Sequence, residues 1–287
     1  MVRPLAGGGQ GHTFIVKRAD GADRAKYVLK RLKNLKRTDR FKQEIDACKQ
    51  LEHPNIVRIV DDDADGAFDP KRRPFLVTEY YSRGSLADNP PRVGTPVLSV
   101  LETFRQICDA VAYAHNHHPR VVHRDIKPDN IFLREDGTVV LGDFGICFID
   151  DEGTRVTMTD EVAGSRFYCA PELRDGRLKD GVPVTTADVY SLGKVLYWML
   201  SGGHKFDREE HRTDEYRLGK HDPGDPAWEL VNELLDSMIV QDWTKRTIDG
   251  ATLSQKVHGL IGIVRAGGHA ITLSVLHRCT FCAQGIY

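Results

Sequence analysis

The sequence contains no apolar run that approaches the ~20 residues needed to span a membrane as a helix. Residues 260–264 are apolar, but Arg265 and two glycines follow directly and end the run. The first residues, from Met1 to Pro4, lead into a glycine cluster instead of the apolar stretch of a secretory leader. We therefore expect a cytoplasmic protein without a membrane span in this chain.

An excess of charge of one sign is also missing. The chain has 40 lysines and arginines against 41 aspartates and glutamates, which gives a formal net charge of −1. This balance gives no reason to expect nucleic acid or an anionic membrane as a partner. Internal repeats and low-complexity tracts are absent as well, so the 287 residues are expected to form one large domain or two lobes.

Cysteine is scarce, and its spacing suggests no disulfide framework. Four of the six cysteines stand singly in apolar surroundings and are interpreted as buried free thiols: Cys48, Cys108, Cys147 and Cys169. The other two, Cys279 and Cys282, form half of a zinc-ribbon-like site, for which His269 and His277 offer poorly spaced further ligands. Two ordinary thiols are the alternative. Because the chain stops soon afterwards, we expect it to be part of a longer protein.

Hydrophobic patterns predict a strand-rich first part and a helical remainder. Short apolar segments bounded by turn residues predict strands at 2–5, 13–17, 27–30, 56–60 and 75–78. Apolar stripes at helical spacing predict helices from Thr38 or Asp39 to about Leu51, and over 98–115 and 188–201. We expect residues 61–74 to form an exposed loop and residues 82–85 a hinge.

The strongest signal is a short polar loop from His123 to Asn130, followed by Asp143, Phe144 and Gly145. It brings together a carboxylate, a cation and an amide. Phosphoryl transfer needs such groups to orient a hydroxyl, to neutralise the migrating phosphate and to hold Mg²⁺ through oxygen atoms.

With these motifs the chain resembles a eukaryotic-type serine/threonine protein kinase, in the form found in bacteria, over residues 2–262. The resemblance implies an α+β, bilobal protein-kinase fold. Its small antiparallel-sheet N-lobe would span residues 1–81 and its larger helical C-lobe residues 82–262, and residues 263–287 would form a C-terminal extension. It further implies an ATP-dependent enzyme that phosphorylates serine or threonine hydroxyls of protein substrates.

The resemblance implies a nucleotide site made by several segments. Ala6, Gly8 and Gly11 match the glycine-rich loop that covers phosphates, with Ala6 in place of the family's first glycine; a plain hairpin turn is the alternative. Lys30 would hold the α- and β-phosphates and pair with Glu44; an exposed lysine and glutamate are the alternative. Thr78, Glu79 and Tyr81 match the hinge strand that lines the adenine.

In the matching catalytic loop, Asp125 would act as the base and Lys127 would neutralise the γ-phosphate. Asn130 and Asp143 would provide oxygen ligands to Mg²⁺, with Mn²⁺ as a possible substitute. His123 is interpreted as structural, as are Asp188 and the expected ion pair of Glu172 with Arg246; these residues are left out of the expected active site.

Regulation is implied by Arg124, since an arginine before the catalytic aspartate usually contacts a phosphorylated activation segment. We expect autophosphorylation at one or more of Thr154, Thr157 and Thr159, with a homodimer as a possible arrangement for transfer between copies. Ser165 matches the hydroxyl that contacts the catalytic aspartate and lysine. A catalytically silent scaffold and a small-molecule phosphotransferase are the alternatives, and both are disfavoured by the full set of motifs.

Overall fold

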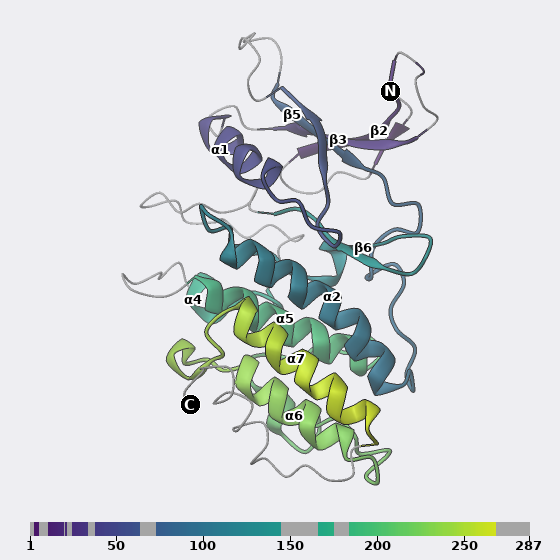
Figure 1. Ribbon diagram of the computed structural model, residues 1–287, viewed down its shortest axis with the longest axis vertical. Helices are drawn as coiled ribbons and strands as arrows, with labels where there is room; N and C mark the ends of the chain where they lie inside the picture. The colour runs from purple at the N-terminus through teal and green to yellow at the C-terminus, as the bar shows by residue number, and fades with distance from the viewer. Residues whose placement is uncertain are drawn as a thin grey trace, which may run out of the picture.

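The computed structural model describes residues 3–5, 11–19, 21, 25–33, 38–63, 73–144, 166–174 and 184–267. These residues form two lobes, a small one that contains a twisted sheet and one helix, and a larger one that is mainly helical (Figure 1). The expected division into a strand-rich first part and a helical remainder is confirmed.

The small lobe is built on a five-stranded antiparallel sheet with the order β1-β2-β3-β5-β4. Its strands are β1 (Arg3–Pro4), β2 (Gly11–Val16), β3 (Tyr27–Leu32), β4 (Ile59–Asp62) and β5 (Phe75–Glu79). Helix α1 (Thr38–Lys49) packs on the sheet through Phe41 and Ile45, which meet Leu32 and Leu76 in a small hydrophobic cluster. This spacing of four residues on α1 is the apolar stripe that predicted the helix.

The strand predicted over 56–60 is wrong at its start, because β4 begins only at Ile59. The preceding residues pair instead with the larger lobe: the N–H of Val57 donates to the carbonyl of Leu141 at 2.9 Å, and the N–H of Leu141 donates to Asn55 at 2.8 Å. Ile56 is buried in the core of the larger lobe. The expected loop is shorter too, since β4 extends to Asp62.

The chain crosses between the lobes at residues 80–84 and then enters the larger lobe. Gly84 has a φ of +74°, and a Cβ there would lie 2.7 Å from a carboxylate oxygen of Asp88, so both the backbone and the space require glycine. Below the crossing lies a two-stranded sheet of β6 (Ile131–Leu133) and β7 (Val139–Leu141).

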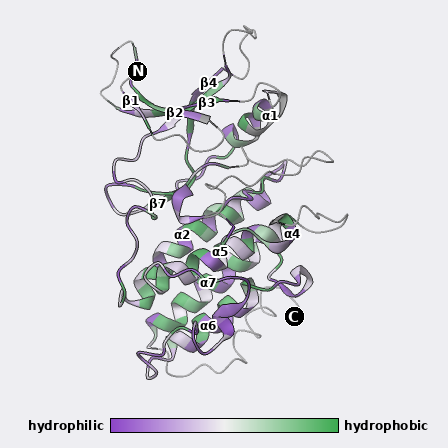
Figure 2. Ribbon diagram, turned by 180° about the vertical axis from the view of Figure 1, so that it is seen from behind, coloured by the Kyte–Doolittle hydropathy of each residue, from purple (hydrophilic) through white to green (hydrophobic). Residues whose placement is uncertain are grey.

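In the residues that the structure describes, the larger lobe contains helices α2 (Val97–Asn116), α4 (Pro171–Arg174), α5 (Thr185–Leu200), α6 (Ala227–Met238) and α7 (Gly250–Arg265). The same described residues include three short 3₁₀ turns: Pro128–Asn130, Glu210–Arg212 and Trp243–Lys245. Every residue of α5 is buried, as its apolar circumference predicted. Figure 2 shows hydrophobic residues concentrated on the helices that surround α5.

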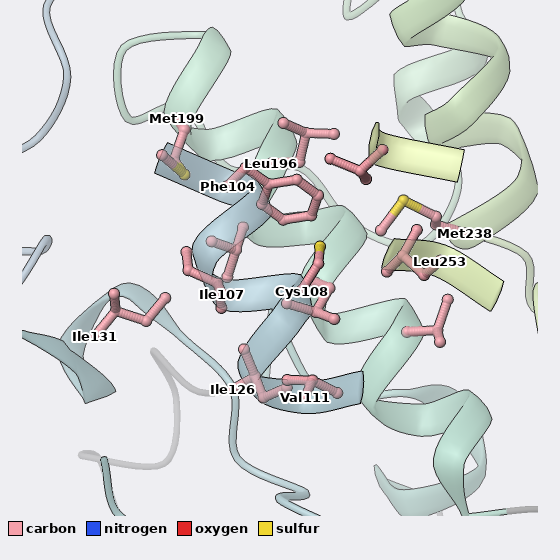
Figure 3. Close-up of a cluster of buried hydrophobic side chains, with 14 of the residues drawn as sticks. Phe104, Ile107, Cys108, Val111, Ile126, Ile131, Leu196, Met199, Met238 and Leu253 are labelled. Atoms are coloured by element: carbon pink, nitrogen blue, oxygen red, sulfur yellow. The ribbon is translucent and has the colours of Figure 1, made fainter. Parts of the chain in front are cut away.

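The core of this lobe reaches the loop that carries the polar motif. Figure 3 shows Phe104 and Cys108 of α2 beside Leu196 of α5, with Ile126 of the loop in the same cluster. Ile126 is 1% exposed. A buried isoleucine between two polar residues thus fixes the loop to the helical core.

The structure also bears on the expected burial of the cysteines and on the expected lack of a membrane span. Cys108 is buried as predicted, but Cys48 and Cys169 are only half-buried, and Cys147 lies outside the described residues. Across the part of the chain that the structure describes, no helix combines the length and the apolarity that crossing a membrane requires.

Candidate active site

Asp125 and Lys127 lie side by side on the polar loop, with the Lys127 ammonium 2.7 Å from a carboxylate oxygen of Asp125. Asn130, at the end of the 3₁₀ turn Pro128–Asn130, donates its amide N–H to the main-chain carbonyl of Asp125 at 2.7 Å and to its carboxylate at 3.0 Å. The amide nitrogen of Asn130 is therefore engaged, and its amide oxygen remains as the atom suited to another ligand.

His123 ties this loop to the segment after β7. Its Nδ1 accepts the N–H of Asp125 at 3.2 Å, so the proton of the ring is on Nε2, which donates to the carbonyl of Gly142 at 2.8 Å. The ring is buried against Phe144, with 4.6 Å between ring centroids. These contacts agree with the structural role expected for His123.

The backbone at Arg124 is strained, with a φ of +65°, and it is held by a buried carboxylate. Asp188 of α5 accepts the N–H of His123 at 2.8 Å and the N–H of Arg124 at 2.7 Å. Burial raises the pKa of Asp188, but the hydrogen bonds that it accepts, led by the one with His115, lower it by more, so the net pKa lies below its ordinary value. Asp188 is therefore a charged acceptor for the loop.

Asp143 pairs with Lys30 across the two lobes, with 3.1 Å between the ammonium and the carboxylate. Burial raises the pKa of Asp143, but the positive charge of Lys30 and its hydrogen bond outweigh that effect and leave the pKa below its ordinary value. Asp143 also has a left-handed backbone, with a φ of +58°. The structure thus places Lys30 next to an ionised carboxylate that comes from a segment 113 residues away.

The sequence matches the protein family described as "Protein kinase domain" over residues 3–257. This chain belongs to the protein kinase domain family. The match covers both lobes, including the loop from His123 to Asn130 and Asp143, so the bilobal kinase fold expected from the sequence is confirmed.

Similar proteins include CBL-interacting protein kinase 21 from Oryza sativa subsp. japonica, 32% identical over 243 residues, 79% of this chain and 44% of that protein. Serine/threonine-protein kinase Pkn1 from Myxococcus xanthus is 32% identical over 260 residues, 87% of this chain and 36% of that protein. The chain therefore spans less than half the length of these curated relatives.

Among solved structures, the PknI kinase domain of Mycobacterium tuberculosis, crystallised as a double mutant, has a similar fold. The TM-score is 0.62 at 22% sequence identity, and the match covers 90% of this chain and 94% of that chain. At this level of identity the likeness supports the fold alone.

In this kinase domain, the residues expected at the hinge lie along and just beyond β5. Thr78 is paired with Val28 of β3 and with Ile59 of β4. The hydroxyl of Tyr81 donates to the carboxylate of Glu79 at 2.9 Å. Burial and the charge of Glu79 raise the pKa of Tyr81 far above its ordinary value, so this hydroxyl stays protonated as a donor.

The aromatic ring of Tyr81 also stacks on Phe132 of β6, with 5.6 Å between centroids and 13° between planes. Phe132 in turn lies against Gly142, where an added Cβ would come within 2.7 Å of the phenylalanine ring. The hinge is thus connected through aromatic packing to the residue that precedes Asp143.

Two further predicted site residues lie in described elements. Gly11 is the first residue of β2, opposite Leu32, and Glu44 lies in α1 without a described side chain. The other predicted residues fall outside the described part of the chain: Ala6, Gly8, Thr154, Thr157, Thr159, Ser165, and the terminal His269, His277, Cys279 and Cys282.

The expected ion pair of Glu172 with Arg246 is confirmed, with oxygen–nitrogen distances of 2.6 and 3.2 Å. The residue that sequence reasoning missed is His115, which is 2% exposed and bonds to Asp188 at 2.9 Å. The available signal was its position on the apolar stripe of α2, four residues after Val111, because a polar group there needs a buried partner.

Proposed function

We propose that this chain is an ATP-dependent protein kinase that transfers the γ-phosphate to serine or threonine hydroxyls of proteins. The observation that carries the proposal is the cluster of Asp125, Lys127 and Asn130, whose hydrogen-bonded polar atoms lie 2.7–3.0 Å apart on one loop. The names of Pkn1 and other relatives, which are serine/threonine kinases, support the class of acceptor.

In this proposal Asp125 accepts or orients the proton of the substrate hydroxyl, and Lys127 neutralises charge on the transferred phosphate. Both tasks depend on position, because phosphoryl transfer involves little covalent chemistry by the protein. The Asn130 amide keeps the Asp125 carboxylate from turning away from the substrate. Lysine at position 127 favours serine/threonine over tyrosine acceptors, as the family resemblance implies.

The donor set fits Mg²⁺, with Mn²⁺ as a substitute. Hard cations prefer oxygen ligands, and the site offers an ionised carboxylate from Asp143 and an amide oxygen from Asn130. The metal, when bound, neutralises the negative charge of the phosphates. Lys30, next to Asp143, is then positioned to contact the same phosphates, with Glu44 as its partner on α1.

We assign the remaining nucleotide contacts to two segments. Ala6, Gly8 and Gly11 cover the phosphates, since backbone N–H groups can approach an anion closely where side chains are small or absent. Thr78, Glu79 and Tyr81 line the adenine at the crossing between the lobes. The kinase domain proper is proposed to span residues 1–262, with residues 263–287 as an extension.

The activity is tested by transfer of labelled γ-phosphate from ATP with Mg²⁺ to a general protein acceptor, followed by analysis of the phosphorylated amino acids. We expect label on serine or threonine, and a loss of at least about 100-fold in Asp125→Asn. Asp222→Asn, an exposed aspartate far along the chain, is the matched control and should keep full activity. ATP binding without transfer in the wild type would instead support a silent scaffold.

Regulation by autophosphorylation is a second part of the proposal, supported by Arg124 beside the catalytic aspartate. Mass spectrometry after incubation with ATP should show phosphate on Thr154, Thr157 or Thr159. Mixing inactive Asp125→Asn with wild type should label the inactive copy, as transfer within a homodimer requires. Full activity in the triple Thr→Ala variant, without phosphate in the wild type, contradicts this part.

A further inference from the structure

Three exposed cations, Arg166, Lys205 and Arg208, have no carboxylate partner among the residues that the structure describes. The guanidinium of Arg166 lies 5.4 Å from the centroid of the Phe167 ring, and the ammonium of Lys205 lies 6.0 Å from the centroid of the Tyr168 ring. Contacts of this kind are weak at exposed sites, so these cations remain able to bind an anion.

The segment that contains Arg166, residues 166–170 directly before α4, is held beside the catalytic loop by α5. The hydroxyl of Ser191 donates to the carbonyl of Tyr168 at 2.8 Å. Asp188, three residues earlier on the same helix, accepts N–H groups from the backbone of the catalytic loop. Residues three apart on a helix are neighbours. A peptide whose hydroxyl reaches the proposed base therefore passes close to this segment.

Tyr168 is a buried residue that has a negative and a positive charge from other segments nearby. Burial raises the pKa of its hydroxyl, and the charge of Asp129, the residue before Asn130 on the catalytic loop, raises it further. The ammonium of Lys205 lies over its ring. A negative group of a ligand is repelled by Asp129 and attracted by Lys205, so we expect it beside Lys205.

The backbone that carries Lys205 and Arg208 is anchored from below by a buried lysine. The ammonium of Lys194, on α5, donates to the carbonyl of Phe206 at 3.2 Å and to the carbonyl of Arg208 at 2.7 Å. It also lies 3.5 Å from the centroid of the Phe206 ring, which is buried as well. Because this backbone is already fixed, less conformational entropy is lost when its exposed cations bind a ligand.

The acidic residues of the same segment are engaged with backbone donors. Asp207 accepts the N–H of Arg208 at 3.0 Å, and Glu210 accepts the N–H of Asp207 at 2.8 Å. Glu209 accepts the N–H of Gln241 at 2.8 Å. These carboxylates already have hydrogen-bonding partners, whereas the neighbouring cations have no acid to pair with. The groups that this surface presents to a ligand are therefore mainly positive.

We propose that Arg166, Lys205 and Arg208 form an acid-recognition surface, which binds an aspartate, a glutamate or a phosphorylated residue near the acceptor hydroxyl of a protein substrate. The inference rests on the proposed kinase function and names its substrate class, serines and threonines in acidic sequences. Carboxylate and phosphate share the required chemistry, because both accept charge-assisted hydrogen bonds from guanidinium and ammonium groups.

The preference is measured with peptides that carry one serine among small neutral residues, with glutamate, glutamine or lysine placed at each neighbouring position in turn. At one or more positions we expect glutamate to raise kcat/KM at least about fivefold over glutamine, and lysine to lower it. Phosphoserine at the same positions should raise kcat/KM further, because it carries more charge. If neither glutamate nor phosphoserine is preferred at any position, the proposal is wrong.

Charge reversal separates recognition from a structural role. In Arg166→Glu and Lys205→Glu, the preference at the responding position should shift from glutamate toward lysine, by at least about fivefold in the ratio of the two kcat/KM values. Lys220→Glu is the matched control and should keep the wild-type ratio, because Lys220 is exposed beside the glycine that packs on Trp228 of α6. A wild-type ratio in both reversal variants overturns the proposal.

Binding without transfer keeps the two proposals distinguishable. A labelled peptide with alanine for the acceptor and glutamate at all neighbouring positions should bind with a Kd at least about fivefold lower than its glutamine counterpart. The difference should shrink between about 0.05 M and about 0.5 M NaCl, since salt screens exposed charges. A wild type that shows this difference but transfers no phosphate refutes the kinase function alone. Transfer with equal affinity for both peptides refutes the acid-recognition surface alone.

Discussion

Arg246 and Glu172 form a buried, bidentate ion pair that joins α4 to the turn following α6. The two terminal nitrogens of Arg246 bond to the two carboxylate oxygens of Glu172, and the side chains are 0% and 7% exposed. The guanidinium also donates to the carbonyls of Thr186 and Val240. All three guanidinium nitrogens of Arg246 therefore donate hydrogen bonds, and these bonds fix α4 to the start of α5.

Arg246→Met should lower the free energy of unfolding by roughly 3–5 kcal/mol, because Glu172 is then buried without its partner. Arg265→Met is the control, since its pair with Glu102 is exposed and should contribute about 1 kcal/mol or less. Urea denaturation of both variants measures the difference. Similar losses in the two variants would show that burial adds nothing to the Arg246 pair.

Gly142→Ala should lower the free energy of unfolding by about 1–3 kcal/mol, because the new methyl would lie 2.7 Å from the ring of Phe132 and 2.9 Å from Val57. Gly224→Ala, where nothing lies within 4 Å, should change it by about 0.5 kcal/mol or less. Thermal unfolding provides the comparison. A Gly142→Ala variant as stable as Gly224→Ala would mean that Phe132 moves aside freely.

The stability of the larger lobe should depend on pH through His211. Burial lowers the pKa of His211 to about 4, although the neighbouring Asp236 raises it. The unfolded chain, with a pKa near 6.5, then binds the proton more readily, so the contribution is complete above pH 6.5 and is lost as the pH falls toward 4. The loss is roughly 3 kcal/mol over that window.

Replacing His211 with Gln should flatten this dependence, measured as the free energy of unfolding between about pH 7 and pH 4. An unchanged slope in His211→Gln would assign the pH dependence to other groups.

Ile126→Ala should lower the free energy of unfolding by about 2–5 kcal/mol, and Ile126→Val by about 0.5–1.5 kcal/mol, because the side chain is 1% exposed in the main core. Phosphate transfer should fall in the same order, since Ile126 lies between Asp125 and Lys127. Ile248→Ala, at 57% exposure, should leave both stability and transfer nearly unchanged. A loss of stability without any loss of transfer would show that the loop keeps its geometry without this anchor.

The sequence predicted those parts of the site in which the groups are close in the chain. Asp125, Lys127 and Asn130 lie within one short loop, so their proximity followed from the motif itself. The pairing of Lys30 with Asp143 is different, because these residues lie 113 positions apart and come from different lobes, so their proximity does not follow from either motif alone. The expected pair of Lys30 with Glu44 stays a prediction, because the side chain of Glu44 is not described.

The misplaced strand over 56–60 has a similar cause. Its apolar residues fit a strand of the small lobe, but Ile56 and Val57 gain more by pairing with β7 and burial in the larger lobe. His115 was missed because periodicity identifies the buried face of a helix without naming the partner of a polar residue on it. The hydrogen bond to Asp188 spans 73 residues and exists only in the folded chain.

The docking of residues 55–57 onto β7 has a mechanical consequence. Among the described residues, the small lobe is joined to the larger one through the covalent crossing at 80–84 and through the bonds of Asn55 and Val57 to Val139 and Leu141, in addition to the ion pair of Lys30 with Asp143. The crossing and the docked segment together define an axis. Opening and closing of the lobes that preserves the bonds of the docked segment is therefore a rotation about the line through both, and β1 and β2, at the far edge of the sheet from β4, travel the farthest.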